Sequence, residues 1–267
     1  MAQTEFCSTA LAASSEGLAS AADMVGVHAA ELWTVVTVET SGCGFLSDRR
    51  PQIRYERHIF HRLTAGKFDD GDISDPAAGG YGSAGAHQYD RLAAAIAYNR
   101  AAALQSASWG IGQIMGENFR AAGFADVESM VDAMTQGEDQ QLTAMANFLL
   151  RSNLSSALKA HDWTSFARGY NGPNFAINQY DRRLNGEFQK LSTTGLPDLV
   201  VRSAQLYLSY LGFDPHGIDG IAGTRALAAL AQFQQQHGLP VTTLIDGAIV
   251  TQLVKALPAV ASVATAP

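Results

Sequence analysis

The stretch HAAELWTVVTVETSGCG, residues 28–44, decides how the N-terminal part of the chain folds. Four of its side chains recur with the spacing of one helical face: Leu32, Val35, Val36 and Glu39. The β-branched run at 35–38 favours a strand instead, because branched side chains fit a pleated sheet well. We predict a helix, since the sequence SGCG at 41–44 supplies a C-terminal stop directly after it.

Glu39 is the first candidate catalytic residue. On the apolar face of a helix, near its C-terminal end, the carboxylate would lose hydration and meet the negative end of the helix dipole. Both effects raise the pKa of a carboxyl group, as a general acid near neutral pH requires. The alternative is that Glu39 turns to solvent or pairs with an arginine in a structural role.

A second carboxyl lies in the basic segment RRPQIRYERHIFHR, residues 49–62. A strand over this segment would place on one face Arg54, Glu56, His58 and Phe60. Glu56 is then expected to be ionised and held by hydrogen bonds. A hairpin that brings Glu56 opposite Glu39 gives two carboxyls in contrasting environments, which suits glycoside hydrolysis. Alternatively, an Arg54–Glu56 salt bridge only braces the hairpin.

Histidines in the same segment do not indicate a metal site. His58 and His61 lack further ligands at a suitable spacing, so we expect no metal and no cofactor.

Two further segments carry candidate substrate-binding residues. The sequence SWGIGQIM, residues 108–115, has glycines that allow close backbone approach to a ligand. Its Gln113 offers a donor and an acceptor, and Trp109 is a candidate for stacking on a sugar face, although a tryptophan in a helical protein is more often core. Tyr170 and Asn171 form a polar pair at a helix end, where a cleft can be lined.

Sequence patterns also predict the organisation of the chain. Helices are expected over 88–104, around 142–149 and over 163–170. The sequence KLSTTGLPD at 190–198 has no helical periodicity, which indicates a linker. It separates a domain of residues 1–189 from a small domain at 199–257, followed by a tail at 258–267.

Composition excludes several classes of protein. The chain has 267 residues, of which 47% are hydrophobic and 16% charged, so it can bury a sizeable core. Its net charge of −7 argues against nucleic-acid binding, which requires a basic surface. No run of about 18 apolar residues exists, so membrane insertion is not expected. Glu5 and Glu16 stand where a signal peptide has basic residues, so we expect synthesis in a host cytoplasm without a signal peptide.

Together, the motifs resemble the lysozyme-like superfamily, and within it the N-acetylmuramidase domain of many phage endolysins. The resemblance covers roughly residues 20–190 and is carried by these segments: Glu39-Thr40-Ser41-Gly42, Gly44-Phe45-Leu46, Arg50-Pro51, Tyr55-Glu56-Arg57-His58-Ile59-Phe60, Gly80-Tyr81-Gly82, Gln113-Ile114-Met115-Gly116, Tyr170-Asn171-Gly172-Pro173 and Tyr180-Asp181. Thr40 departs from the usual serine, and Gly112 from a bulkier apolar residue.

The resemblance implies a mainly α-helical fold, a lysozyme-like α+β domain with a small β-hairpin. It implies cleavage of the β-1,4 bond between N-acetylmuramic acid and N-acetylglucosamine in peptidoglycan. Glu39 matches the general acid and Glu56 a second acidic position. The alternatives are a lytic transglycosylase, which gives 1,6-anhydro ends, and a wall-binding protein without activity.

The C-terminal domain resembles a three-helix peptidoglycan-binding domain. The matching residues include Gln205, Leu211-Gly212, Asp219-Gly220, Phe233-Gln234 and Asp246-Gly247. Such a module holds an enzyme on an insoluble substrate and raises its local concentration. The missing signal peptide and membrane span fit release through a separate holin-type pore, after which we expect a monomer to act on the cell wall.

Overall fold

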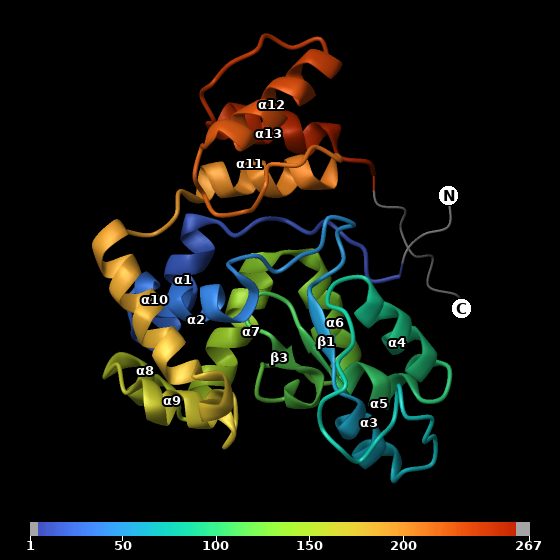
Figure 1. Cartoon of the computed structure of the whole chain (residues 1–267). Helices are drawn as coiled ribbons and strands as arrows, with labels where there is room; N and C mark the ends of the chain where they lie inside the picture. Colours follow the sequence, from blue (N-terminus) through green and yellow to red (C-terminus); the bar gives the residue numbers. More distant parts are fainter. Residues whose placement is uncertain (1–4, 260–267) are drawn as a thin grey trace.

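The computed structural model describes residues 5–259. A larger N-terminal lobe contains the first ten α-helices and a small sheet, and a smaller lobe contains the last three helices (Figure 1). The predicted tail, apart from 258 and 259, lies outside the described residues. Within 5–259, no helix has both the length and the apolar character needed to cross a membrane.

Helix α2 (Ala29–Thr40) confirms the helical interpretation of the opening stretch. Its apolar side chains from Leu32 to Val36 are buried against several neighbours, including α1 (Ser15–Val25) and α10 (Tyr180–Thr194). Burial on more than one side stabilises the helix enough to outweigh the strand preference of its β-branched residues. The helix stops at Ser41, whose φ of 55° lies in the left-handed region.

The sheet is smaller than the sequence pattern predicts. Three antiparallel strands follow one another in the order β1 (Ile53–Tyr55), β2 (Ala107–Trp109) and β3 (Ile114–Met115). Ile53 pairs with Trp109, and Trp109 in turn pairs with Ile114. Of the strand predicted over residues 49–62, only 53–55 form, because the chain continues as helix α3 (Arg57–Thr64).

The helix predicted over 88–104 is divided in two, α4 (His87–Ile96) and α5 (Arg100–Gln105). The break occurs because Asn99 leaves the helical conformation and its side chain accepts a hydrogen bond from the Ala102 amide, 3.0 Å away. Asn99 therefore caps a new helix instead of continuing the first one.

The remaining elements of the large lobe include both other predicted helices, α7 and α9. Between β3 and α10, in chain order, lie η1 (Gly116–Asn118), α6 (Val127–Gln136), α7 (Glu138–Arg151), α8 (Ser155–Lys159), α9 (Trp163–Tyr170) and η2 (Phe175–Asn178). Helix α10 continues to Thr194, so the predicted linker is helical over its first five residues. Only residues 195–198 separate α10 from the next helix.

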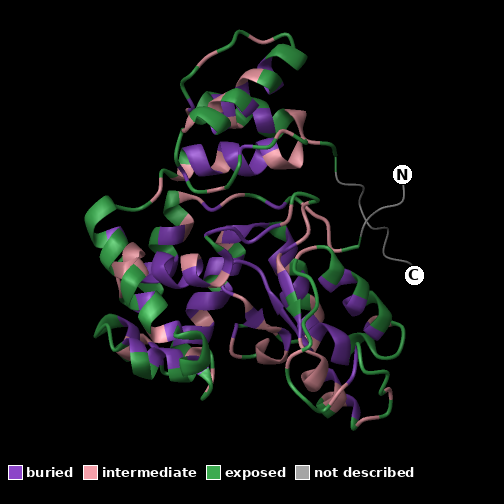
Figure 2. Cartoon of the chain, in the orientation of Figure 1, coloured by how far each residue is buried: buried purple, intermediate pink, exposed green. Residues whose placement is uncertain are grey.

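The small lobe is the expected three-helix unit of α11 (Leu199–Tyr210), α12 (Thr224–Gln236) and α13 (Gly247–Ala256). Aspartates cap two of these helices, since Asp198 accepts from backbone amides at the start of α11 and Asp246 from one at the start of α13. Its apolar core lies between the three helices, separate from the large core below it (Figure 2).

Candidate active site

Glu39 lies in the last turn of α2, partly covered by the N-terminal end of α10. The Tyr180 hydroxyl donates a hydrogen bond to Glu39 Oε1, and the Arg183 guanidinium donates to the Val38 carbonyl at 2.8 Å. Burial raises the pKa of Glu39 to about 7, although Tyr180, Arg54 and Arg183 all favour its ionised form. Glu39 thus has the acidity that a general acid needs near neutral pH.

A pocket of about 410 Å³ opens at Glu39. Its walls come from the end of α2, strand β1, the turn after α9, the end of η2 and the start of α10. They are mostly polar side chains that can exchange hydrogen bonds with a ligand rich in hydroxyl groups, and the lining residues are Val38, Glu39, Arg54, Asn171, Asn178, Tyr180 and Arg183.

Glu56 occupies the junction between β1 and α3, where it stands just before the first helical residue. Burial raises its pKa to about 7, against the opposing effects of Arg54 and the Tyr81 hydroxyl. The expectation that Glu56 is ionised therefore applies only above about pH 7, because loss of hydration outweighs the attraction of its neighbours.

Arg54 connects the two carboxyls. Its positive charge lowers the pKa of both Glu39 and Glu56, so it stands close enough to act on each. The exposed guanidinium also lies 5.2 Å from the centre of the Tyr81 ring. Glu39 and Glu56 therefore share Arg54 as a neighbouring cation, although the strand at 53–55 pairs with residues 107–109.

His58 is in the first turn of α3, not on a strand. Its Nδ1 lies 3.3 Å from Glu56 Oε2, so it remains a neighbour of the second carboxyl by helical geometry. Burial lowers the pKa of His58, with a further contribution from Arg62. Throughout residues 5–259, no three His, Cys, Asp or Glu side chains gather in a way that could hold a metal ion.

Trp109 does not line the cleft, which corrects the prediction that it stacks on sugar. Its side chain is fully buried, and its Nε1 donates to the Leu104 carbonyl at 3.1 Å. Trp109 therefore belongs to the core beneath the sheet, where the indole nitrogen has its own partner.

Gln113 shapes the turn between β2 and β3. Its Nε2 donates to the carbonyls of Gly110 and Gln52, and its Oε1 accepts from the Ser108 hydroxyl. With a φ of 49°, Gln113 holds the turn in a left-handed conformation. These bonds use most of the capacity of the amide, so its role in the structure is to stabilise the hairpin.

Tyr170 and Asn171 play different parts. The Tyr170 hydroxyl donates to the Gly112 carbonyl at 2.6 Å, and its ring stacks on Phe166, so this residue ties α9 to the β-hairpin. Asn171 is exposed at the end of α9 and lines the pocket beside Glu39. Only Asn171 of this pair is free to contact a ligand.

Local sequence patterns did not point to four residues of the site: Tyr81, Asn178, Tyr180 and Arg183. Tyr180 is 141 positions from Glu39, so no helical or strand spacing connects them. Tyr81 and Tyr180 do occur within segments that carry the family resemblance, which is the one signal that points to them.

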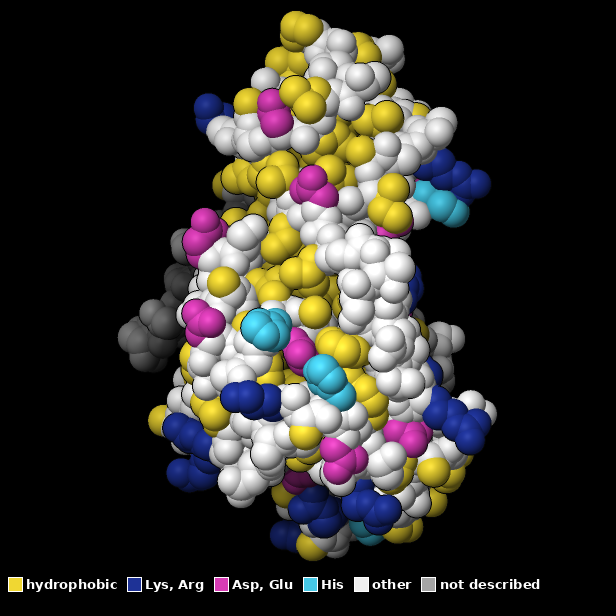
Figure 3. All heavy atoms as spheres, turned by 90° about the vertical axis from the view of Figure 1, so that its left-hand side faces the viewer, with side chains coloured by type: hydrophobic (Ala, Val, Ile, Leu, Met, Phe, Trp, Pro, Cys, Tyr) yellow, Lys and Arg dark blue, Asp and Glu magenta, His cyan; other side chains and the backbone are white. Residues whose placement is uncertain are grey.

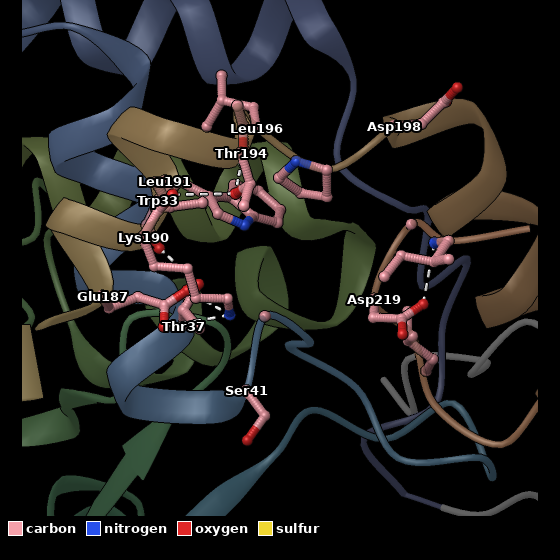
Figure 4. A pocket seen from close by; sticks show the side chains of 16 residues that line it. Trp33, Thr37, Ser41, Glu187, Lys190, Leu191, Thr194, Leu196, Asp198 and Asp219 are labelled. Atoms are coloured by element: carbon pink, nitrogen blue, oxygen red, sulfur yellow. Dashed lines mark hydrogen bonds and ion pairs between the residues drawn. The ribbon is translucent and has the colours of Figure 1, made fainter. Parts of the chain in front are cut away.

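A second cavity, of about 440 Å³, lies between the lobes. Figure 4 shows Trp33 and Thr37 of α2 and Ser41, directly after it, on one side, and Asp198 and Asp219 on another. Figure 3 shows apolar side chains exposed in the hollow between the lobes.

Comparisons with known proteins identify both lobes. Residues 28–192 match the N-acetylmuramidase family, and residues 197–253 match a putative peptidoglycan-binding domain. The structure of a Burkholderia AP3 phage endolysin is similar, with 40% sequence identity and a TM-score of 0.60. The match covers 66% of this chain and 69% of the endolysin chain. No curated protein matches the chain.

Proposed function

The chain belongs to the N-acetylmuramidase family of peptidoglycan hydrolases, and on this basis we propose that Glu39 is its general acid. The observation that carries the proposal is the buried Glu39 carboxyl, which has a pKa of about 7 and stands at the edge of a polar pocket. Glu39 transfers its proton to the oxygen of the β-1,4 bond between N-acetylmuramic acid and N-acetylglucosamine. That oxygen then leaves as the hydroxyl group of the released glycan.

Glu56 is the second carboxyl of the reaction. In its ionised form it either bonds to the anomeric carbon, from which water later displaces it while returning a proton to Glu39, or it takes a proton from the water molecule that attacks this carbon. Arg54 favours ionisation of Glu56, which offsets part of the effect of burial. Asn171 and Arg54 line the pocket, which supports a role for them in contacting the sugar and its acidic substituents.

The small lobe anchors the enzyme to peptidoglycan. Its match to a peptidoglycan-binding domain and the 40% identity of the chain to a phage endolysin support the role of an endolysin that lyses a bacterial host. We extend the proposal to a monomer that reaches the wall through a separate holin-type pore.

Digestion of purified peptidoglycan tests the chemistry. We expect mass spectrometry to find new reducing muramic acid ends, which borohydride reduces. Muramic acid ends in the 1,6-anhydro form would instead identify a lytic transglycosylase. A wild-type protein that binds walls without releasing fragments would leave only the binding function.

The variant Glu39→Gln tests the assignment of the acid. It keeps the shape of the side chain and removes the proton, so we expect kcat to fall at least about 1,000-fold with little change in wall binding. The matched variant Glu16→Gln, exposed on α1, should keep wild-type activity. Wild-type turnover by E39Q would refute the assignment.

A further inference from the structure

The two lobes are joined by a buried ion pair close to the catalytic helix. Arg202 of α11 and Glu138 at the start of α7 are both fully buried, and Arg202 Nη1 lies 2.6 Å from Glu138 Oε2. Arg202 Nη2 donates to the other oxygen of Glu138, also at 2.6 Å. The guanidinium therefore binds the carboxylate through two parallel hydrogen bonds, the strongest form of this interaction.

The same guanidinium holds the segment that ends α2. Arg202 Nε donates to the Gly42 carbonyl at 2.8 Å, and Nη2 donates to the same oxygen. Gly42 has a φ of 83° and lies three positions after Glu39. Arg202 thus fixes the carbonyl of a residue in the turn that terminates the catalytic helix.

Glu138 completes this arrangement from the other side. Its Oε1 accepts from the Gly44 amide and its Oε2 from the Ala13 amide, each at 2.8 Å. The ion pair consequently connects four segments: the N-terminal strap at Ala13, the turn at Gly42–Gly44, the start of α7, and α11 of the small lobe.

The contact continues as an apolar interface. The Trp33 ring of α2 lies 5.3 Å from the Arg202 guanidinium, and Leu206 of α11 is buried against Cys43 within the turn and Phe45 just after it. The turn after Glu39 is therefore covered by the small lobe on both its polar and its apolar sides.

We propose that Arg202, supplied by the peptidoglycan-binding domain, is a positioning residue for Glu39, so that this domain contributes to turnover as well as to anchoring. The proposal rests on the proposed role of Glu39. Without Arg202, the buried Glu138 has no counterion, and the turn at Gly42 loses its donors. The turn must then rearrange, and displacement of a catalytic group by about 1 Å costs roughly 100-fold in rate.

The full-length variant Arg202→Met tests this inference, with Arg225→Met on the exposed part of α12 as the matched control. Soluble glycan fragments give kcat and KM, and pelleting with intact walls gives the affinity of the small lobe. We expect R202M to lose at least about 10-fold in kcat while wall affinity changes less than about twofold. R225M should match the wild type in kcat.

The pH profile separates positioning from a general loss of structure. A loosened turn admits water to Glu39, which lowers its pKa and moves the alkaline limb of kcat/KM to lower pH. The variant Arg202→Lys keeps the positive charge but loses the planar guanidinium that binds two oxygens at once, so it should fold. We expect kcat to fall about threefold and the alkaline limb to move to lower pH, as in R202M.

Two results would overturn the proposal. One is wild-type kcat and an unchanged alkaline limb in R202K, which remains informative even if R202M does not fold. The other is a loss in R202M that weaker wall binding explains completely. If E39Q retains activity, the proposed function itself fails, whatever Arg202 does.

Discussion

At the scale of single residues, the site is defined by two glutamates whose acidity is set mainly by burial. Each has a pKa raised to about 7, and the charge of Arg54 opposes the shift in both. In the roles that we propose, Glu39 must be protonated to act as the acid, and Glu56 must be ionised. Activity is therefore lost above the pKa of Glu39 and below that of Glu56. We expect a narrow, bell-shaped profile of kcat/KM with its maximum near pH 7.

The Tyr180 hydroxyl adjusts this acidity. Its hydrogen bond favours the ionised form of Glu39, so the variant Tyr180→Phe should raise the pKa of Glu39. The alkaline limb of kcat/KM then moves to higher pH, by up to about one unit. Tyr170→Phe removes a nearby hydroxyl that is bonded to the Gly112 carbonyl instead, and it should leave the limb in place. If the alkaline limb of kcat/KM in Y180F moved to lower pH, the Tyr180 hydroxyl would not be favouring the ionised form of Glu39.

Burial of Glu39 also has a cost for stability. The folded protein favours protonated Glu39, whose pKa rises from 4.5 to about 7. Stability is thus unaffected below about pH 4.5, falls as the pH rises to about 7, and stays lower above that value. E39Q should therefore be more stable than the wild type at pH 8, on the order of 3 kcal/mol, with a small difference at pH 4.5. Urea unfolding at both pH values measures this, with E16Q as the exposed control.

At the scale of elements, a buried amide joins three parts of the site. Gln88 of α4 accepts from the Tyr55 amide of β1, and its Nε2 donates to the carbonyls of Tyr81 and Ser83. One side chain therefore ties the strand before Glu56 to the loop that carries Tyr81.

The variant Gln88→Met keeps the length of this side chain but leaves the buried Tyr55 amide without its partner and removes one donor from each of the Tyr81 and Ser83 carbonyls. We expect the free energy of unfolding to fall by about 1 to 3 kcal/mol. The Tyr81 carbonyl keeps its bond from Arg91 but loses the one from Gln88, so the Tyr81 loop is held less firmly and kcat should fall as well. Gln140→Met, exposed on α7, is the control and should change the free energy of unfolding by less than about 0.5 kcal/mol. Equal stabilities of the two variants would show that the amide bonds contribute little.

Sequence periodicity predicted elements best where a whole helical face is buried. Helix α2 carries a complete apolar face, and its stop signal is local. The segment after Tyr55 was wrongly predicted as a strand because its sequence fits both the two-residue period of a strand and the spacing of a helix. In the structure it is helix α3, in which Phe60 and Thr64 are buried four positions apart. Strand β1 has three residues and helix α3 has eight, and elements this short show too few repeats for the sequence to distinguish a strand period from a helix period.

The candidate site was predicted in its local parts and missed in its long-range ones. Glu39 was found because its position on an apolar helix face implies burial. Trp109 was misassigned because aromatic character alone does not distinguish a core from a cleft. Tyr180 bonds to Glu39, 141 positions away, and Arg202 bonds to Gly42, 160 positions away. No local sequence pattern encodes contacts over such separations.

At the scale of the whole molecule, the ion pair between the lobes makes their stabilities interdependent. Glu138 lies in the large lobe, and its counterion Arg202 lies in the small one. A fragment of residues 1–196 keeps the carboxylate and loses the cation. It also exposes the surface of Phe45 and Cys43 that Leu206 covers. The fragment should therefore unfold at a lower temperature than the intact chain.

The variant Glu138→Gln should lower the stability of the intact chain but raise that of the 1–196 fragment. In the intact chain it leaves Arg202 buried without a counterion, which we expect to destabilise the protein by about 3 to 5 kcal/mol. In the fragment it removes an uncompensated buried charge, so it should raise the melting temperature. Calorimetry of the four proteins measures both effects in one double-mutant cycle. Because a residue important only for packing within the large lobe would destabilise both forms alike, the reversal of sign is the result that identifies a charge balanced across the lobes.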